Sequence, residues 1–185
     1  VSDKPQTTRT RILGVQHGTQ ERPGQVVFVD TPGIHRPLHR MNVRMVDQAV
    51  EAITQMDVVV MVVDASASSG AGDRFVLDLL ARASGPVILA LNKIDLISKP
   101  RLLPIIARYH KESNFVGLVP FSALSGDGIS VLETLIWEHL PEGKPLYPDD
   151  YLTDQPERFI VAEMVREQVL HPTYAALPFF TGVGV

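Results

Sequence analysis

The sequence predicts an α/β fold in which a mostly parallel sheet carries helices on both faces. Short, unbroken apolar runs at residues 26–29, 58–63 and 86–91 have the length and composition of strands that are buried on both faces. Segments with apolar residues at helical spacing follow the second and third runs. Strands that alternate with helices in this way form parallel sheets with helical layers on either side.

Each element has its own local signal. Pro23 and Gly24 mark a turn between an edge strand over 11–16 and its partner over 25–29. Apolar residues at helical spacing, such as Ile129, Leu132 and Ile136 in the last segment, define the helices. The remaining expected strands cover 58–63, 86–91 and 118–121, and the expected helices cover 41–55, 73–83, 100–113 and 128–139. In the third of these helices, Pro104 is expected near the first turn, where proline is tolerated.

Composition limits the classes of protein to consider. A chain of 185 residues with 45% hydrophobic residues can bury a proper core. Its net charge of -4 does not indicate a nucleic-acid-binding protein, although a small basic module can be hidden in such an average. The absence of cysteine excludes disulfides, a disulfide-linked partner and thiolate metal sites, and it fits a cytoplasmic location. No apolar run approaches the ~20 residues of a membrane span.

The first candidate site follows the strand over 26–29. Asp30 stands where this strand is expected to leave the sheet, and Thr31, Pro32 and Gly33 then turn the chain sharply. A carboxylate beside an unobstructed backbone N–H suits a phosphate chain that carries Mg²⁺. An ordinary strand and turn with a solvated Asp30 is the alternative. Asp64 also ends an apolar strand, and whether it caps a loop or takes part in chemistry stays open.

The second candidate site follows the strand over 86–91 and reads Asn92-Lys93-Ile94-Asp95. The Asp95 carboxylate can accept two N–H groups from one edge of guanine, a pair that adenine does not offer. Lys93 can lay its aliphatic stem on the purine face, and Asn92 can tie neighbouring loops together. Ser122 and Ala123, after the next strand, are small enough for backbone N–H groups to approach the base. The alternative is a loop at a helix entry in which Asp95 is solvated or caps the helix.

These motifs, in this order and spacing, resemble the G domain of translation-factor-type GTPases. The words Q-T-T-R at 6–9 and V-D-T-P-G-I-H at 29–35 are similar to the Era-like branch of the TrmE-Era-Der GTPases. The stretch 147–168 resembles the segment that joins the GTPase domain of this branch to a KH-type RNA-binding domain. The resemblance implies a P-loop-GTPase-type sheet, followed by the start of an α+β KH-type domain.

The resemblance also implies roles for individual residues. Thr8 matches the switch threonine that ligates Mg²⁺ in the GTP state, with Thr7 as the weaker candidate. Asp30 is expected to hold the same ion through water, and the N–H of Gly33 to sense the γ-phosphate, so Thr8 and Gly33 are the expected catalytic positions. Ile34 stands where Ras-like proteins have a water-orienting glutamine, which implies slow intrinsic hydrolysis. The residues expected to bind GTP or GDP are Asp30, Thr31, Pro32, Gly33, Asn92, Lys93, Asp95, Ser122 and Ala123.

Two departures from the family pattern concern the ends of the chain. No phosphate-binding loop of the type G-x-x-x-x-G-K-[ST] occurs, and no G-x-x-G clamp of a KH domain occurs. We therefore expect the chain to be the retained part of a longer protein. The expected organisation is a GTPase domain over 1–141 without its first strand, phosphate loop and first helix, a linker over 142–156, and a partial KH-type domain over 157–185.

Two functions from different classes follow from these expectations. The first is a GTP-hydrolysing switch that binds small-subunit ribosomal RNA through a KH domain and assists assembly of the 30S subunit. The second is a non-catalytic RNA-binding assembly factor that keeps the fold without phosphate binding. Asp95 favours the first, because a protein that no longer binds nucleotide has no physical need for a guanine-reading acid. Peripheral association with the inner membrane and a dependence on potassium stay open.

Overall fold

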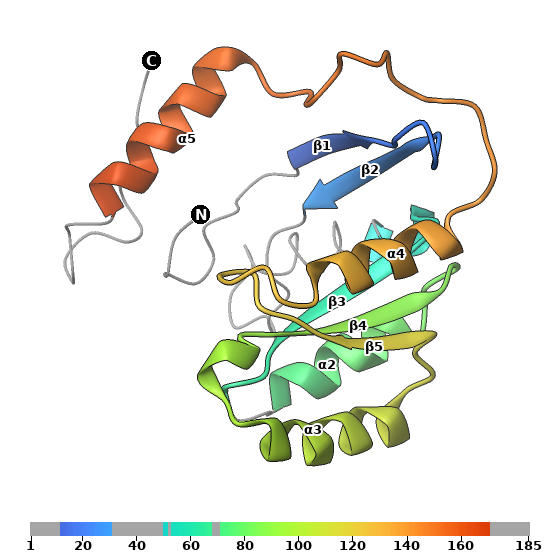
Figure 1. Cartoon of the computed structure of the whole chain (residues 1–185), viewed down its shortest axis with the longest axis vertical. Helices are drawn as coiled ribbons and strands as arrows, with labels where there is room; N and C mark the ends of the chain where they lie inside the picture. Colours follow the sequence, from blue (N-terminus) through green and yellow to red (C-terminus); the bar gives the residue numbers. More distant parts are fainter. Residues whose placement is uncertain (1–11, 31–49, 52, 68–70, 171–185) are drawn as a thin grey trace. The chain divides into compact units, whose positions relative to one another are not determined.

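The computed structural model describes residues 12–30, 50–51, 53–67 and 71–170 of the chain (Figure 1). The chain divides into two compact units. One, here called the sheet unit, comprises residues 34–143, and the other, the hairpin unit, comprises residues 1–33 and 144–185. The boundaries expected for the GTPase, linker and KH-type regions stay a prediction.

The sheet unit contains three parallel strands in the order β3-β4-β5. They are β3 (Val59–Asp64), β4 (Val87–Asn92) and β5 (Gly117–Pro120). The helices are α2 (Ala71–Leu80), α3 (Lys99–Glu112) and α4 (Ile129–His139), with a short 3-10 helix η1 (Ile94–Leu96) after β4. Figure 1 shows α2 and α3 on one face of this sheet and α4 on the other. The α/β class predicted from the sequence is confirmed.

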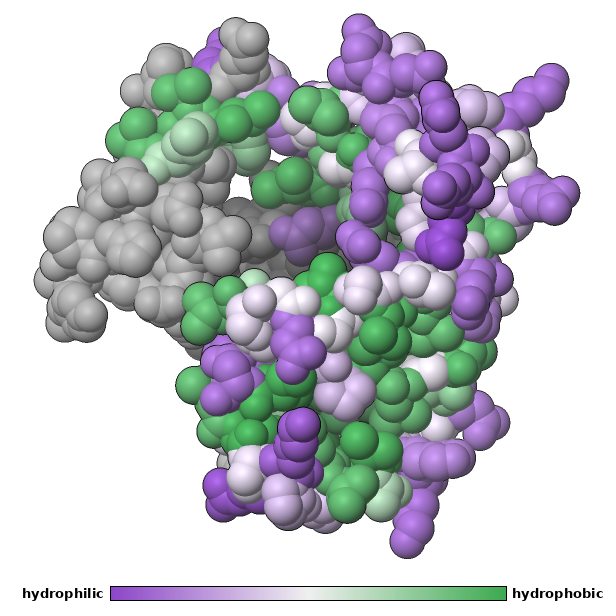
Figure 2. Space-filling model, in the orientation of Figure 1, coloured by the Kyte–Doolittle hydropathy of each residue, from purple (hydrophilic) through white to green (hydrophobic). Residues whose placement is uncertain are grey.

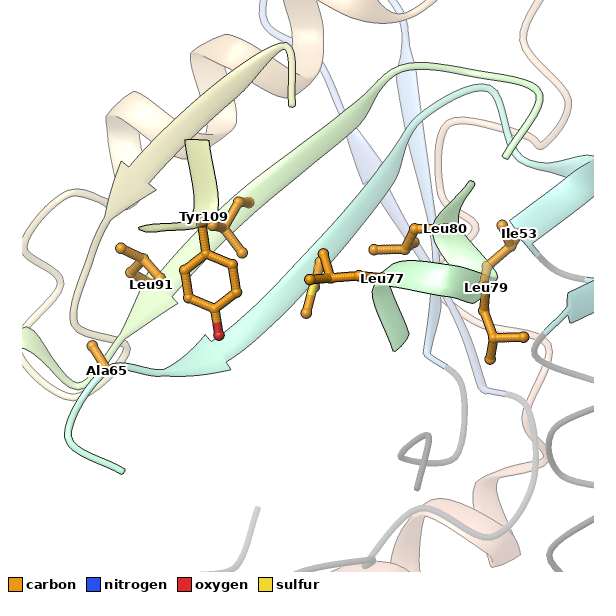
Figure 3. Close-up of a cluster of buried hydrophobic side chains, with 9 residues drawn as sticks. Ile53, Ala65, Leu77, Leu79, Leu80, Leu91 and Tyr109 are labelled. Carbon is orange, nitrogen blue, oxygen red and sulfur yellow. The ribbon is translucent and has the colours of Figure 1, made fainter. Parts of the chain in front are cut away.

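Strand β4 is the centre of the sheet unit. Its residues Ile88, Leu89, Ala90 and Leu91 are all 0% exposed, as expected for a strand that is covered on both faces. Because side chains alternate along a strand, Leu89 and Leu91 lie on the same face of the sheet, and both belong to the main hydrophobic cluster. Figure 3 shows this cluster, to which α2 and α3 also contribute. The loop that follows β4 therefore begins at a fully buried strand.

The hairpin unit is built on the antiparallel strands β1 (Ile12–His17) and β2 (Gln25–Asp30), paired from Ile12 opposite Asp30 to His17 opposite Gln25. The predicted edge strand and its partner are thus confirmed. The expectation that the run 26–29 is buried on both faces of the parallel sheet is wrong, because β2 pairs with β1 in an antiparallel hairpin whose alternating side chains leave Phe28 42% exposed. The segment after residue 144 is hydrogen-bonded to this hairpin. The Val15 N–H donates to the Leu152 carbonyl at 2.8 Å, and the Gln25 amide oxygen accepts the N–H of Leu146 at 2.9 Å. This segment is therefore ordered against the hairpin.

The last helix of the hairpin unit, α5 (Glu157–Leu170), lies in the region where the resemblance implies the first helix of a KH-type domain. Several of its large apolar side chains are exposed. In Figure 2, hydrophobic residues gather over this helix. They are Ile160, Val161, Met164 and Val165.

Element limits differ from prediction by a few residues at several places. Helix α2 ends at Leu80, before the expected residue 83, because the Arg82 and Ala83 N–H groups bond to carbonyls three residues back and tighten the last turn. The expectation that Pro104 lies near the first turn of α3 is wrong. The helix begins at Lys99, so Pro100 takes the first turn and Pro104 lies inside the helix. Of the helix expected over 41–55, only the helical residues 50–51 and 53–55 are described.

Candidate functional site

The candidate site lies at the carboxyl ends of the three parallel strands. Asp64, the last residue of β3, is in register with Asn92, the last residue of β4. On the other side of β4, the Phe121 N–H donates to the Leu91 carbonyl at 2.8 Å and extends the pairing beyond the end of β5. The loops after all three strands therefore start from one edge. In open α/β sheets, ligands bind outside this edge.

Asn92 joins the loops that follow β4 and β5. Its side-chain oxygen accepts the Lys93 N–H at 2.7 Å and the Ala123 N–H at 3.0 Å. The first contact stays within the β4 loop, and the second reaches 31 residues along the chain into the β5 loop. The structure thus shows the tie between neighbouring loops that the sequence predicts for Asn92.

Lys93 turns away from its own strand and reaches the end of β3. Its backbone is left-handed, with φ 64° and ψ 36°, a conformation that is uncommon for residues other than glycine. Its ammonium nitrogen lies 2.7 Å from Oδ2 of Asp64. The other oxygen of Asp64 accepts the Ser66 N–H at 2.9 Å and the Ser66 hydroxyl at 2.6 Å. Asp64 therefore caps its loop and also pairs with a residue of the predicted base site.

The surroundings of Asp64 favour its charged form. Burial by itself raises the pKa of this carboxyl group. The hydrogen bonds from Lys93 and Ser66, with the positive charge of Lys93, outweigh burial and lower the pKa from 3.8 to about 2. Asp64 is therefore a carboxylate at neutral pH.

Asp95 is held by the loop after β5. Ser122, which is 0% exposed, donates its hydroxyl to Oδ1 of Asp95 at 2.5 Å. The same hydroxyl oxygen accepts the Ser125 N–H at 3.1 Å, so the serine rotamer is fixed from two sides. Asp95 itself is exposed. Because a carboxylate has about four acceptor positions, Asp95 can accept further N–H donors while it is bonded to Ser122.

Gly128 keeps the β5 loop folded back against its own strand. Its φ of 77° is in the left-handed region, and a Cβ atom there would lie 2.4 Å from the Pro120 carbonyl oxygen. Glycine alone has neither the backbone strain nor the clash. In the same loop, the Ser122 N–H donates to the Asp127 carbonyl at 2.8 Å. This tight turn presents Ser122 and Ala123 beside the β4 loop.

The structure thus brings five predicted residues together at one edge of the sheet unit: Asn92, Lys93, Asp95, Ser122 and Ala123. Asp30 is described as the last residue of β2, in the hairpin unit, and is exposed. Its predicted role with Mg²⁺ stays a prediction. The other predicted residues lie outside the described part of the chain: Thr7, Thr8, Thr31, Pro32, Gly33 and Ile34.

Asp64 is the site residue that the sequence left unassigned. The sequence signal for Asp64 is its position at the end of the apolar run 58–63. The structure adds that this strand, β3, lies next to β4 in the sheet. Within the described ranges, no cluster of three or more potential side-chain ligands is positioned to hold a metal ion. None of the described helices has the length and apolar character needed to cross a bilayer.

The pairing of Asp64 predicts a pH-dependent contribution to stability. Because its pKa is lower in the folded state, its stabilisation is present above about pH 4 and decreases as the pH falls toward 2. Asp64→Asn should lower the free energy of unfolding at pH 7 by up to ~1 kcal/mol, since the pair is partly exposed and screened by solvent. Urea denaturation of both proteins from pH 7 to pH 3 measures this difference, which should shrink below pH 4. A difference that stays constant with pH would contradict the role of the charge.

Comparisons with known proteins identify the family of this chain. The sequence profile of the family described as 50S ribosome-binding GTPase matches residues 1–93. GTPase Era of Geotalea uraniireducens (strain Rf4) is 48% identical over 185 residues, which are 100% of this chain and 61% of that protein. GTPase Era of Staphylococcus haemolyticus (strain JCSC1435) is 40% identical, with the same coverage of both chains.

A solved structure is also similar to this chain. The crystal structure of Era in complex with MgGDPNP and nucleotides 1506–1542 of 16S ribosomal RNA is 36% identical, with a TM-score of 0.83. The match covers 91% of this chain and 57% of that chain. The predicted resemblance to the Era-like branch is confirmed, and the chain spans 61% of the length of its curated relatives. The chain belongs to the 50S ribosome-binding GTPase family, and GTPases Era are relatives that it resembles along its whole length.

Proposed function

We propose that this chain supplies the guanine-binding part of a GTP-hydrolysing switch that acts on ribosomal RNA. The observation that carries the proposal is the exposed Asp95 carboxylate, which the buried Ser122 hydroxyl holds at 2.5 Å. A carboxylate with a fixed orientation at the carboxyl edge of a parallel sheet can accept the N–H groups on one edge of guanine. The similarity to GTPases Era supports the same conclusion.

Base selection follows from the donors and acceptors. Guanine offers a ring N–H and an exocyclic amine on one edge, and both can donate to Asp95. Adenine offers an acceptor nitrogen at the ring position, which would face the carboxylate without a hydrogen bond. A site built to pair with a base edge can reject the wrong base by ~10⁴-fold, because its polar groups are left unpaired. The partly exposed stem of Lys93 offers the purine a surface on which to stack.

Hydrolysis is assigned to the residues that precede the sheet unit. We propose that Asp30 and Thr8 hold Mg²⁺, with Thr7 as the weaker candidate. Mg²⁺ prefers hard oxygen ligands, and the Asp carboxylate and the Thr hydroxyl both supply them. The ion would neutralise charge on the phosphates, and the Gly33 N–H would sense the γ-phosphate. Because Ile34 cannot orient water, intrinsic hydrolysis should be slow. An Era relative solved with MgGDPNP supports this choice of nucleotide and ion.

We propose small-subunit ribosomal RNA as the macromolecular partner, bound through a KH-type domain that begins with α5. Support comes from the Era relative whose structure contains nucleotides 1506–1542 of 16S ribosomal RNA. The corresponding role is assistance in assembly of the 30S subunit in the cytoplasm. Peripheral association with the inner membrane is an additional proposal, and binding of full-length protein to vesicles of anionic lipid would test it.

Nucleotide selectivity tests the proposed function. The protein expressed from its complete reading frame should bind GDP at least ~10³-fold more tightly than ADP, since only guanine pairs with Asp95. Isothermal titration calorimetry with both nucleotides in the presence of Mg²⁺ measures the ratio. Equal affinities would reject the assignment of Asp95. Binding of 16S ribosomal RNA without affinity for either nucleotide would favour a non-catalytic assembly factor instead.

A further inference from the structure

We propose that Asp64 is a positioning residue of the base site. It holds the Lys93 ammonium at the end of β3 and thereby keeps the Asp95 carboxylate open to the N–H groups of a purine base. This inference rests on the proposed recognition of guanine by Asp95. It adds a specificity determinant that lies on a different strand from the Asn92–Asp95 motif.

The motif itself creates an electrostatic problem. Lys93 and Asp95 are separated by one residue, and both are exposed. A lysine ammonium on its flexible four-carbon stem can pair with a carboxylate so near in the chain. Such a pair would occupy the acceptor positions that a base needs. Guanine would then have to displace the ammonium before it could donate to Asp95.

The observed contacts avoid this competition. The Lys93 ammonium lies 2.7 Å from Asp64, whereas Asp95 accepts the neutral hydroxyl of Ser122 at 2.5 Å. The two carboxylates at neighbouring strand ends therefore take different partners. Asp64 takes the cation, and Asp95 takes a group that fixes its orientation without neutralising its charge.

Asp64 is well suited to hold a cation in place. Its Oδ1 accepts both the N–H and the hydroxyl of Ser66, which leaves Oδ2 directed at Lys93. The left-handed backbone of Lys93 starts its side chain in a direction that ends at β3. Because the lysine side chain spans from the end of β4 to the end of β3, its stem is restrained. Its side chain remains 51% exposed, so a flat ring can still approach it.

A double-mutant cycle tests this role. Asp64→Asn keeps the shape of the side chain and an oxygen that can accept from Ser66, but it removes the charge that attracts Lys93. GDP affinity should then fall by about fivefold, because the base must break a new pair between Lys93 and Asp95, and an exposed ion pair typically changes an equilibrium by about this factor. Lys93→Met keeps an apolar stem and removes the ammonium. In that background, Asp64→Asn should change GDP affinity by less than about 1.5-fold, because no cation remains to occupy Asp95.

The salt dependence gives a second readout that a purely structural role would not change. The loss caused by Asp64→Asn should shrink at 1 M salt, since screening weakens a new pair between Lys93 and Asp95. Asp64→Glu retains the charge and should restore affinity to within about twofold of the wild type. Asp78→Asn removes one exposed carboxylate from α2 and serves as the matched control, with unchanged GDP affinity.

Each outcome bears on the inference. Two outcomes would overturn the role of Asp64, provided that the wild-type protein prefers GDP to ADP. One is that Asp64→Asn causes the same loss of GDP affinity with and without the Lys93→Met substitution. The other is that Asp64→Asn causes no loss of GDP affinity when Lys93 is present. If the wild-type protein does not prefer GDP to ADP, the proposed guanine recognition fails, and the role of Asp64 fails with it. All titrations use the protein expressed from its complete reading frame, and the probes are GDP and ADP with Mg²⁺.

Discussion

Asp95→Asn should shift the preference of the protein from guanine to xanthine nucleotides. The asparagine amide has one acceptor and one donor, and it no longer matches two N–H groups of guanine. Xanthine replaces the exocyclic amine with a carbonyl, so its edge pairs with the amide. We expect GDP affinity to fall by about 10⁴-fold and XDP to become the tighter ligand, because unpaired polar groups in a site are costly. Calorimetric titration with GDP, XDP and ADP measures the shift.

Two controls support the interpretation of that shift. Asp95→Ala should weaken GDP without any gain for XDP, since alanine has no polar group to offer. The thermal unfolding midpoint of both variants should stay close to that of the wild type, because Asp95 is exposed and its bond to Ser122 is one contact. Unchanged preference for GDP in the asparagine variant would show that another group reads the base.

Tyr109→Ala should cause a large loss of stability in the sheet unit. The Tyr109 side chain, from α3, is 1% exposed and belongs to the cluster with Leu91, Leu77 and Ala65 (Figure 3). Its removal leaves a cavity behind the strand that ends in Asn92. Aromatic-to-alanine changes at buried positions cost about 3–5 kcal/mol. Urea denaturation, followed by circular dichroism, measures the free energy of unfolding.

Tyr109→Phe separates packing from hydrogen bonding at the same position. The Tyr109 hydroxyl donates to Oδ2 of Asp73 at 3.2 Å. Burial, together with the charge of Asp73 and this hydrogen bond, raises the pKa of Tyr109 to about 12, so the hydroxyl keeps its proton at neutral pH. Loss of this bond should cost about 1 kcal/mol. Equal effects of the two substitutions would show that the ring itself contributes little to the stability of the core.

Local patterns in the sequence were enough to predict most elements of the fold. The apolar runs at 58–63 and 86–91 identified β3 and β4. Strand β4 is buried on both faces, as such a run predicts, whereas Val62 of β3 is 59% exposed. The turn at Pro23 and Gly24 identified the β1–β2 hairpin for a similarly local reason. Helix ends were less accurate. The end of α2 depends on a tightened last turn, and the start of α3 at Lys99 changed the position of Pro104 within it.

Local sequence patterns were sufficient to place Asn92, Lys93, Asp95 and Ser122 at strand ends, and hence to make them candidates for one base site. How these side chains pair depends on the folded arrangement of the strands and loops. Asp64 opposes Asn92 because β3 and β4 are parallel and in that register, and Ser122 reaches Asp95 because the β5 loop turns back at Gly128. Partners separated by about 30 residues along the chain have no local signal. Strand register and loop geometry therefore assign the cation to Asp64 and the hydroxyl to Asp95.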